Sequence, residues 1–159
     1  MSVLNLALLG LIILLVFGII RTGQKNKQVA LQNREAAQQF LAHNATLPDV
    51  VSLPSGLQYQ VLSAVESGQS PTAGSEVKVH YHGTLLSGAV FDSSVNRGEP
   101  ISFKLSQVIA GWTEGLQLMK VGEKFRFYIP AELAYGDRAA GAIAPGSLLI
   151  FEVELLAVL

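Results

Sequence analysis

Two histidines, His80 and His82, form the most obvious metal-binding pair in this sequence. They lie two positions apart in an alternating segment, so both side chains would project from one face of a strand. A metal site needs more ligands than two, and no third His or Cys and no positioned carboxylate completes one here. The sequence therefore predicts no metal site.

Nucleophilic and nucleotide chemistry have equally little support. The chain has no cysteine, which excludes disulfides, thiolate chemistry and Cys-based zinc sites. No G-x-S-x-G elbow is present to activate a serine, and neither of the glycine-rich phosphate-binding motifs occurs. Because the formal net charge is only -1, no basic field exists to hold phosphates. We therefore expect no hydrolase, no nucleotide site and no nucleic-acid partner.

Alternation of apolar and polar residues predicts the strands of the C-terminal two thirds of the chain. A period of two is typical of half-buried strands, whereas only residues 112–119 have helical character before a stop at Gly122. Several antiparallel strands with one short helix indicate an α+β fold, with a sheet of five or six strands wrapped around that helix. The predicted strands cover residues 58–62, 77–82, 101–104, 125–129 and 149–155.

Two aromatic residues are placed by this alternation alone. Tyr81 shares strand parity with Val77 and Val79 and should face the core, while Phe151 belongs to the inward set of the last strand. For either ring taken alone, ordinary core packing is the simplest interpretation.

The first twenty residues differ in composition from the rest. Residues 3–20 carry no charge, and a helix of that length would span about 27 Å, close to the hydrocarbon core of a bilayer. A cleaved signal peptide is the alternative, but no Lys or Arg precedes the run and no suitable cleavage site follows it. The sequence predicts a transmembrane anchor over residues 1–22 that contacts the lipid bilayer through residues 3–20.

Residues 23–45 predict a helical stalk between the anchor and a domain over residues 46–159. The stalk is rich in helix formers, and Pro48 and Pro54 mark its end. Its irregular apolar stripe would pack against the domain, pair with a second copy in a homodimer, or bind a dedicated partner. The stripe consists of Val29, Ala36, Ala37, Phe40 and Leu41.

Five segments in order carry a family resemblance. They read LPSGLQYQVL at residues 53–62, HYHGTLLSGAVFDSSVNRG at 80–98, VIAGWTEGLQLM at 108–119, IPAELAYG at 129–136 and LLIFEVELL at 148–156. Together they resemble the FKBP family of tacrolimus-binding prolyl isomerases, and the first segment is most similar to the bacterial macrophage infectivity potentiator subfamily. The resemblance implies an FKBP-like fold for nearly all of residues 55–159.

The resemblance also implies an activity and a site. It implies a peptidyl-prolyl cis-trans isomerase that acts on unfolded or folding proline-containing polypeptides and needs no cofactor. Such a site should be dry and aromatic, because an apolar environment disfavours the charge-separated planar amide, whose rotation barrier is about 18 to 20 kcal/mol. The resemblance assigns catalytic roles to Tyr81, Phe91, Asp92, Ile109 and Tyr135. It assigns substrate binding to Arg97, Phe103, Gln107, Val108, Trp112, Ile143 and Phe151.

Asp92 has two interpretations. Taken alone, it reads as a turn carboxylate that accepts hydrogen bonds from nearby backbone amides. The resemblance makes it instead a polar wall of the pocket, held by Tyr81 and Arg97 and facing a substrate carbonyl. Since Tyr135 and the N–H of Ile109 would donate to substrate carbonyls, catalysis would rest on preorganised donors rather than on proton transfer.

The sequence departs from the family pattern in two loops. Residues 136–146 form a shortened loop that carries Asp137-Arg138-Ala139-Ala140, which leaves open the preference before proline and the binding of macrolide inhibitors. The connection from Lys104 to Gln107 is also short, so that Ile101 competes with Phe103 for the pocket.

Two rival functions and the location of the domain stay open at this stage. A tethered chaperone that holds unfolded segments, or an assembly factor that works through its stalk, would need little turnover. Arg21, Lys25 and Lys27 follow the anchor and favour a cytoplasmic domain. The subfamily resemblance favours a single-pass inner-membrane protein with a periplasmic domain.

Overall fold

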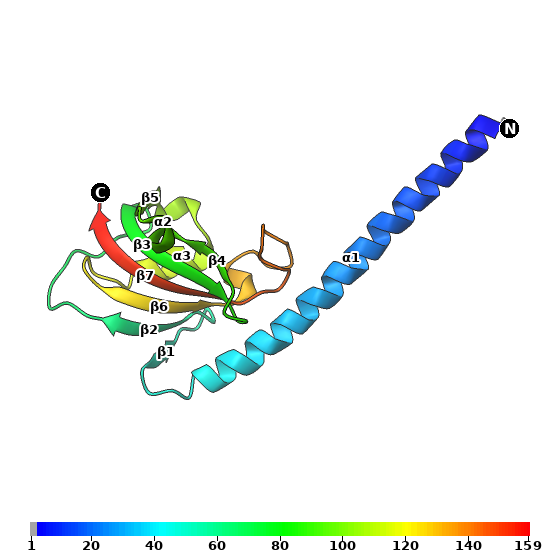
Figure 1. Ribbon diagram of the computed structural model, residues 1–159. Helices are drawn as coiled ribbons and strands as arrows, with labels where there is room; N and C mark the ends of the chain where they lie inside the picture. The colour runs from blue at the N-terminus through cyan, green and yellow to red at the C-terminus, as the bar shows by residue number, and fades with distance from the viewer. Residues whose placement is uncertain (1–2) are drawn as a thin grey trace.

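The computed structural model describes the backbone of residues 3–159 and the side chains of residues 21–159. A long helix is followed by a sheet domain (Figure 1). The helices are α1 (Val3–Asn44), α2 (Ser94–Arg97) and α3 (Ala110–Leu116), with short 3-10 turns η1 (Leu105–Gln107) and η2 (Ala131–Leu133). The strands are β1 (Val50–Ser52), β2 (Gln58–Ser63), β3 (Glu76–Leu85), β4 (Val90–Ser93), β5 (Ile101–Lys104), β6 (Lys124–Ile129) and β7 (Leu149–Val158).

The predicted anchor at residues 3–20 lies outside the residues whose side chains are described. Within residues 21–159, no helical stretch is long and apolar enough to cross a bilayer.

The strands form one antiparallel sheet in the order β1-β2-β6-β7-β3-β4, and β5 pairs with the first half of β3. The α+β prediction is confirmed, but the predicted count of five or six strands is wrong, because this sheet has seven. Strands β1 (VVS) and β4 (VFDS) were missed because their few residues do not alternate between apolar and polar, whereas those of the equally short β5 (ISFK) do. The one-helix prediction likewise missed the four-residue α2.

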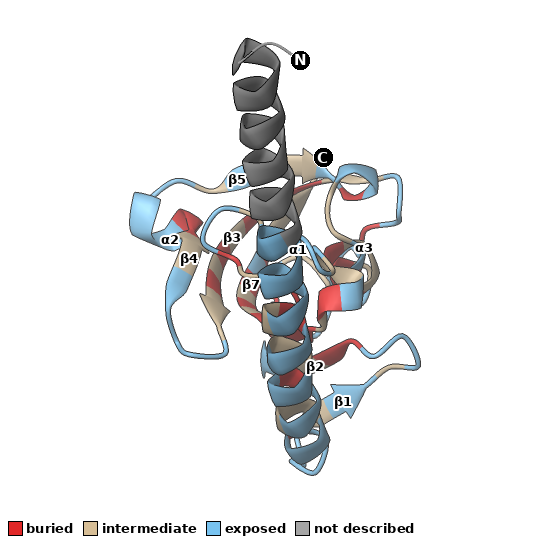
Figure 2. Cartoon of the chain, turned by 90° about the vertical axis from the view of Figure 1, so that its right-hand side faces the viewer, coloured by how far each residue is buried: buried red, intermediate tan, exposed pale blue. Residues whose placement is uncertain are grey.

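The sheet curves around α3, and the core lies between them (Figure 1). Trp112 and Leu116 of α3 are buried against the inward side chains of β3, β6 and β7, which include Val79, Phe127 and Val153. Figure 2 shows that the buried positions lie mostly in the sheet domain, whereas most of the described part of α1 is exposed. The helix ends at Leu116, three residues before the predicted end.

Helix α1 packs against the domain along part of the predicted apolar stripe. Phe40 lies against Tyr128, with ring centroids 5.7 Å apart, and Ala37 is buried. Tyr128 alternates with Phe127, which faces α3, so this part of α1 covers the opposite face of the sheet. Ala36 remains exposed.

Two glycines allow α3 to lie close to β6. A Cβ added to Gly115 would lie 2.6 Å from Cε1 of Phe127, and one added to Gly111 would lie 2.5 Å from Cγ2 of Ile129. A side chain at either position would therefore force the helix and the strand apart. The depth of the core therefore depends on the absence of side chains at these two positions.

The substitution Gly115→Ala tests this packing. Alanine favours an exposed helix by about 1 kcal/mol over glycine, but here overpacking should lower the free energy of unfolding by about 1 to 3 kcal/mol. Urea unfolding measures the difference, and Gly74→Ala is the matched control, because a Cβ at Gly74 meets no atom within 4 Å. A stabilised Gly115→Ala variant would contradict the account.

Candidate active site

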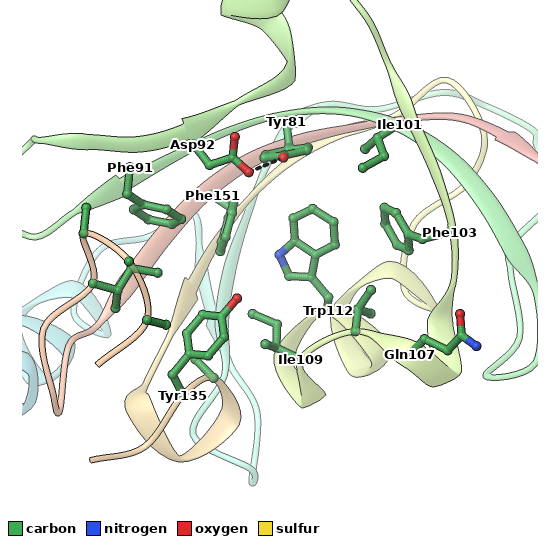
Figure 3. Close-up of a pocket in the computed structure, with 16 residues that line it drawn as sticks. Tyr81, Phe91, Asp92, Ile101, Phe103, Gln107, Ile109, Trp112, Tyr135 and Phe151 are labelled. Carbon is green, nitrogen blue, oxygen red and sulfur yellow. Dashed lines mark hydrogen bonds between the residues drawn. The ribbon is translucent and has the colours of Figure 1, made fainter. Parts of the chain in front are cut away.

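An open cavity of about 700 Å³ lies between the sheet, the start of α3 and the loop that follows η2. Trp112 forms its floor, with the rings of Phe103, Tyr81 and Phe151 around it (Figure 3). The centroid of Trp112 lies 5.1 Å from that of Phe103, 5.3 Å from that of Tyr81 and 5.0 Å from that of Phe151. Tyr81 and Phe151 meet Trp112 edge to face and Phe103 lies tilted against it, so the rings restrain one another and form an apolar cup.

The strand pattern explains why the rings meet. Tyr81 on β3 and Phe151 on β7 occupy inward positions and are both buried, as parity predicts. Gly83 faces the same side two residues after Tyr81, and a Cβ there would lie 2.8 Å from both Phe151 and Phe91. Its missing side chain thus makes room for the edge contact of Phe91 on Phe151, whose centroids are 5.3 Å apart. Sequence reasoning did not identify this role of Gly83.

One wall of the cavity is polar. The Tyr81 hydroxyl donates a hydrogen bond to Oδ2 of Asp92, and Nη1 of Arg97 forms an ion pair with Oδ1 of the same carboxylate. Nη2 of Arg97 also donates to the Tyr81 hydroxyl oxygen at 2.9 Å. Both carboxylate oxygens are therefore held, which fixes the orientation of Asp92 at the cavity.

Short local structures place Asp92 and Arg97 together. Asp92 lies near the end of β4, and Ser93 caps α2 by accepting a hydrogen bond from the Asn96 N–H at 3.1 Å. Gly98 ends this single turn in the left-handed conformation, with φ of 72°. This turn brings Arg97 back beside Asp92, which precedes it by five positions in the chain.

The two histidines brace the same segment from β3. Nδ1 of His80 lies 3.0 Å from Oγ of Ser94, and Nδ1 of His82 lies 2.9 Å from Oγ of Ser93. The Ser94 hydroxyl also accepts the Tyr81 N–H at 2.8 Å. These side chains, first considered as metal ligands, support the end of β4 that carries Asp92.

The network sets the charge of the polar wall. Burial raises the pKa of Asp92, but hydrogen bonds from Tyr81 and Arg97 outweigh it, so the pKa lies below its ordinary value of 3.8. Burial and the neighbouring Asp92 carboxylate raise the pKa of Tyr81 above its ordinary value of 10.0. At neutral pH the wall therefore presents an ionised carboxylate and a neutral phenol, and neither is poised to transfer a proton.

Further donors lie at the rim and the floor. The Tyr135 hydroxyl points into the cavity (Figure 3) from a side chain that is 43% exposed. Ile109 is the N-cap residue of α3, where backbone N–H groups lack partners within the helix. Nε1 of Trp112 is buried and has no hydrogen-bond partner among the described residues. The site therefore offers several donors to a bound acceptor.

Eleven of the twelve predicted site residues line this cavity, and Arg97 lies behind its wall. Ile101 lines it together with Phe103, so the two do not exclude one another. The cavity residues that sequence reasoning did not assign are small and carry no chemical signal: Ala134, Ala140, Gly141 and Ala142.

Comparison with known proteins gives consistent matches. A family model described as FKBP-type peptidyl-prolyl cis-trans isomerase matches residues 67–156, and one described as the domain amino terminal to it matches residues 18–61. The chain is 52% identical over 137 residues to FKBP-type peptidyl-prolyl cis-trans isomerase FkpA of Aeromonas hydrophila, covering 86% of this chain and 51% of that protein. It is 45% identical over 139 residues to Outer membrane protein MIP of Legionella longbeachae, covering 87% and 59%.

A solved structure extends the likeness to the arrangement of the whole chain. The crystal structure of FkpA from Escherichia coli aligns with a TM-score of 0.90 at 38% identity, covering 99% of this chain and 73% of that one. The chain spans only about half to three fifths of the length of the two curated relatives above.

The polar wall predicts a pH-dependent contribution to stability. Because folding lowers the pKa of Asp92, its interactions stabilise the fold above the ordinary value and are lost as the pH falls through the lowered one. Asp92→Asn should lower the free energy of unfolding at pH 7 by about 1 kcal/mol or less, since both partners are about half exposed.

Urea unfolding between pH 7 and pH 2 measures how this difference changes. It should shrink as the pH falls from 3.8 through the lowered pKa of Asp92, because protonation of the wild-type carboxylate removes the same charge. Asp49→Asn is the control, because Asp49 is an exposed carboxylate outside the polar wall. A difference that stayed constant down to pH 2 would show that the charge of Asp92 does not matter.

Proposed function

Since this chain belongs to the family of FKBP-type peptidyl-prolyl cis-trans isomerases, we propose that it accelerates cis-trans isomerisation of X-Pro bonds in folding polypeptides. The observation that carries this proposal is the aromatic cup on Trp112 with one polar wall. The cup matches the apolar ring of proline in character, and the donors at the cavity, the Tyr135 hydroxyl and the Ile109 N–H, match the flanking carbonyl groups.

The apolar floor of the cup would lower the barrier to rotation about the X-Pro bond. An amide resists rotation because resonance gives its C–N bond partial double-bond character and separates charge between N and O. Water stabilises that charge separation, whereas an environment of Phe103, Trp112 and Phe151 does not. Transfer of the X-Pro amide into this cup should therefore bring the planar form closer in energy to the twisted form.

Preorganised polar groups would hold the peptide while its bond rotates. The Tyr135 hydroxyl and the Ile109 N–H lie at the cavity and would donate to substrate carbonyl oxygens. The ionised carboxylate of Asp92 can only accept hydrogen bonds, so it would face the electropositive carbonyl carbon before proline rather than the oxygen. Tyr81 and Arg97 fix Asp92 before substrate arrives, so no reorganisation is needed during rotation. This mechanism requires no proton transfer and no cofactor.

The activity is tested with the full chain in detergent and a short X-Pro peptide, by following relaxation to the equilibrium isomer ratio after a solvent jump. The uncatalysed reaction takes tens to hundreds of seconds at 25 °C, which gives a clear baseline. Phe91→Ala removes one wall of the cup and Asp92→Ala removes the polar wall. Each should lower kcat/KM about tenfold or more, equivalent to about 1.4 kcal/mol of transition-state stabilisation.

Val51→Ala serves as the control, since Val51 is exposed on the edge strand β1 and should leave kcat/KM unchanged. A folded wild-type chain with no acceleration would contradict the proposal. If that chain nevertheless suppressed aggregation of unfolded proteins, and the Phe91 and Asp92 variants did so equally well, the chaperone interpretation would replace it.

We also propose that residues 3–20 anchor the chain in a bilayer, with the domain on the periplasmic side. The uncharged apolar sequence of this segment supports the anchor, and one relative carries the name Outer membrane protein MIP. The charges at Arg21, Lys25 and Lys27 argue for the opposite orientation.

A phosphatase reporter that is active only in the periplasm, fused after Leu159, tests this topology. We expect activity in intact cells, with the chain recovered in the membrane fraction. A cytoplasm-active reporter fused at the same position is the control. Signal from the cytoplasmic reporter alone would reverse the orientation, and recovery of the chain in the soluble fraction would contradict the anchor.

Two ligand and assembly proposals follow from the same features. Macrolide inhibitors would occupy the cup around Trp112, which has the volume of about 700 Å³ and the apolar lining that such ligands require. A homodimer would form through α1, where Leu31 is 60% exposed.

A further inference from the structure

One face of α1 contacts the loop that borders the cavity. Ala30, Asn33, Arg34 and Ala37 have the spacing i, i+3, i+4 and i+7, so they lie on a single side of the helix. Ala30 and Ala37 are buried, while the neighbouring Glu35 is exposed. We call this set the loop-facing side of α1.

The loop-facing side holds both ends of residues 136–146. Nδ2 of Asn33 donates to the carbonyl oxygen of Pro145 at 2.8 Å, near the end of the loop. Nε of Arg34 donates to Oδ1 of Asp137 at 2.9 Å, near its start. These contacts join residues 112 and 103 positions apart. In Figure 1 the loop, drawn in orange, extends from the domain toward α1.

Close backbone packing adds to these hydrogen bonds. Gly146 has a φ of 73°, and a Cβ there would overlap the backbone of Ala30. The loop can therefore approach α1 only because this position is glycine. Gly146 also donates from its N–H to the carbonyl oxygen of Gly136 at 2.9 Å, so the base of the loop is closed against the helix.

The other end of the loop reaches the substrate cavity. Ala140 and Ile143 exchange two backbone hydrogen bonds of 2.9 Å, which shape the tip of the loop. Residues 140–143 line the cavity, and Ile143 is buried in the core. A movement of Gly136 and Gly146 at the base of the loop would therefore also move residues 140–143, because backbone hydrogen bonds hold this short segment together.

Arg34 also stabilises the segment before the loop. It forms an ion pair with Glu132 of η2 in addition to Asp137. These two carboxylates flank Tyr135, but the backbone there has its own support, because the Gly136 N–H donates to the Ala131 carbonyl oxygen at 2.7 Å. Loss of Arg34 should therefore loosen the loop more than it displaces Tyr135.

We propose that the loop-facing side of α1 is a positioning element for the substrate cavity: it holds residues 136–146 where the loop can contact the peptide bound there. This inference rests on the proposed isomerase function, and it makes Arg34 and Asn33 positioning residues that touch no substrate. It means that the stalk contributes to substrate affinity as well as separating the domain from the N-terminal segment.

The expected effect falls on KM. A loop that contacts the peptide equally before and during rotation contributes uniform binding, which changes KM and leaves kcat alone. Arg34 is partly exposed, so its ion pairs are modest. We expect Arg34→Ala to raise KM about two- to fivefold and Asn33→Ala with Arg34→Ala to raise it about tenfold, with kcat within about twofold of wild type.

The experiment uses the full chain in detergent, with KM and kcat measured for an X-Pro peptide and amide hydrogen exchange measured by mass spectrometry. Exchange should quicken in residues 136–143 and stay unchanged in β3 and β7. Arg34→Lys should recover part of the wild-type KM, because it keeps the charge but not the geometry of both ion pairs. Glu35→Ala, one position along α1 and exposed, should match wild type in both measurements.

Two results would overturn the inference. One is an Arg34→Ala variant with the KM and loop exchange of the Glu35→Ala control. The other is a general rise in exchange through β3 and β7 without a change in KM, which would mean that α1 supports only the stability of the domain. An inactive wild-type chain would contradict the proposed function instead, and loop exchange would still decide whether α1 holds the loop.

Discussion

The close approach of α3 to the inner face of the sheet is the constraint on which the cavity depends. Gly111 and Gly115 bring the helix against Ile129 and Phe127, closer than any side chain would allow. That distance sets the height of Trp112 beneath the rings of β3 and β7. A helix held farther away would lose the edge-to-face contacts and leave a wider, wetter space, in which an amide would keep its hydration. Fold stability and the dryness of the site thus come from the same packing.

The hydrogen bonds of the polar wall offset the cost of placing a carboxylate beside an apolar cup, where it has less contact with water. Asp92 stays at the cavity because Tyr81 and Arg97 together satisfy both of its oxygens. Tyr81 belongs to the aromatic cup and to the polar network at once, since its ring packs on Trp112 while its hydroxyl donates to Asp92. Disturbing either part should therefore disturb the other.

How much of the sheet the sequence revealed depended on whether apolar and polar residues alternate along each strand. The long strands β3, β6 and β7 displayed their alternation, and parity alone placed Tyr81 and Phe151 on the inner face. The residues of β1 and β4 do not alternate in this way, so these two strands were missed, whereas the four-residue β5 does alternate and was predicted. The remaining cavity residues came from family resemblance, because an isolated aromatic such as Phe91 gives no sign of whether it packs in a core or lines a pocket.

The contacts of α1 with residues 136–146 were beyond sequence reasoning for another reason. The apolar stripe suggested packing against the domain, and Phe40 does pack there. However, Arg34 and Asp137 read as ordinary surface charges, and nothing in the sequence joins positions 103 residues apart. Gly146 likewise looks like a turn residue until the backbone of Ala30 is seen against it.

The most direct test of the central claim uses the fact that Trp112 is the only tryptophan in the chain. Its fluorescence should report occupancy of the cup without any label. Titration with an X-Pro peptide should shift Trp112 emission in a saturable way, with a midpoint that agrees with the KM for isomerisation of that peptide. Isomerisation that proceeds while Trp112 emission stays unchanged at saturating peptide would contradict the account, because the reaction would then occur outside the aromatic cup.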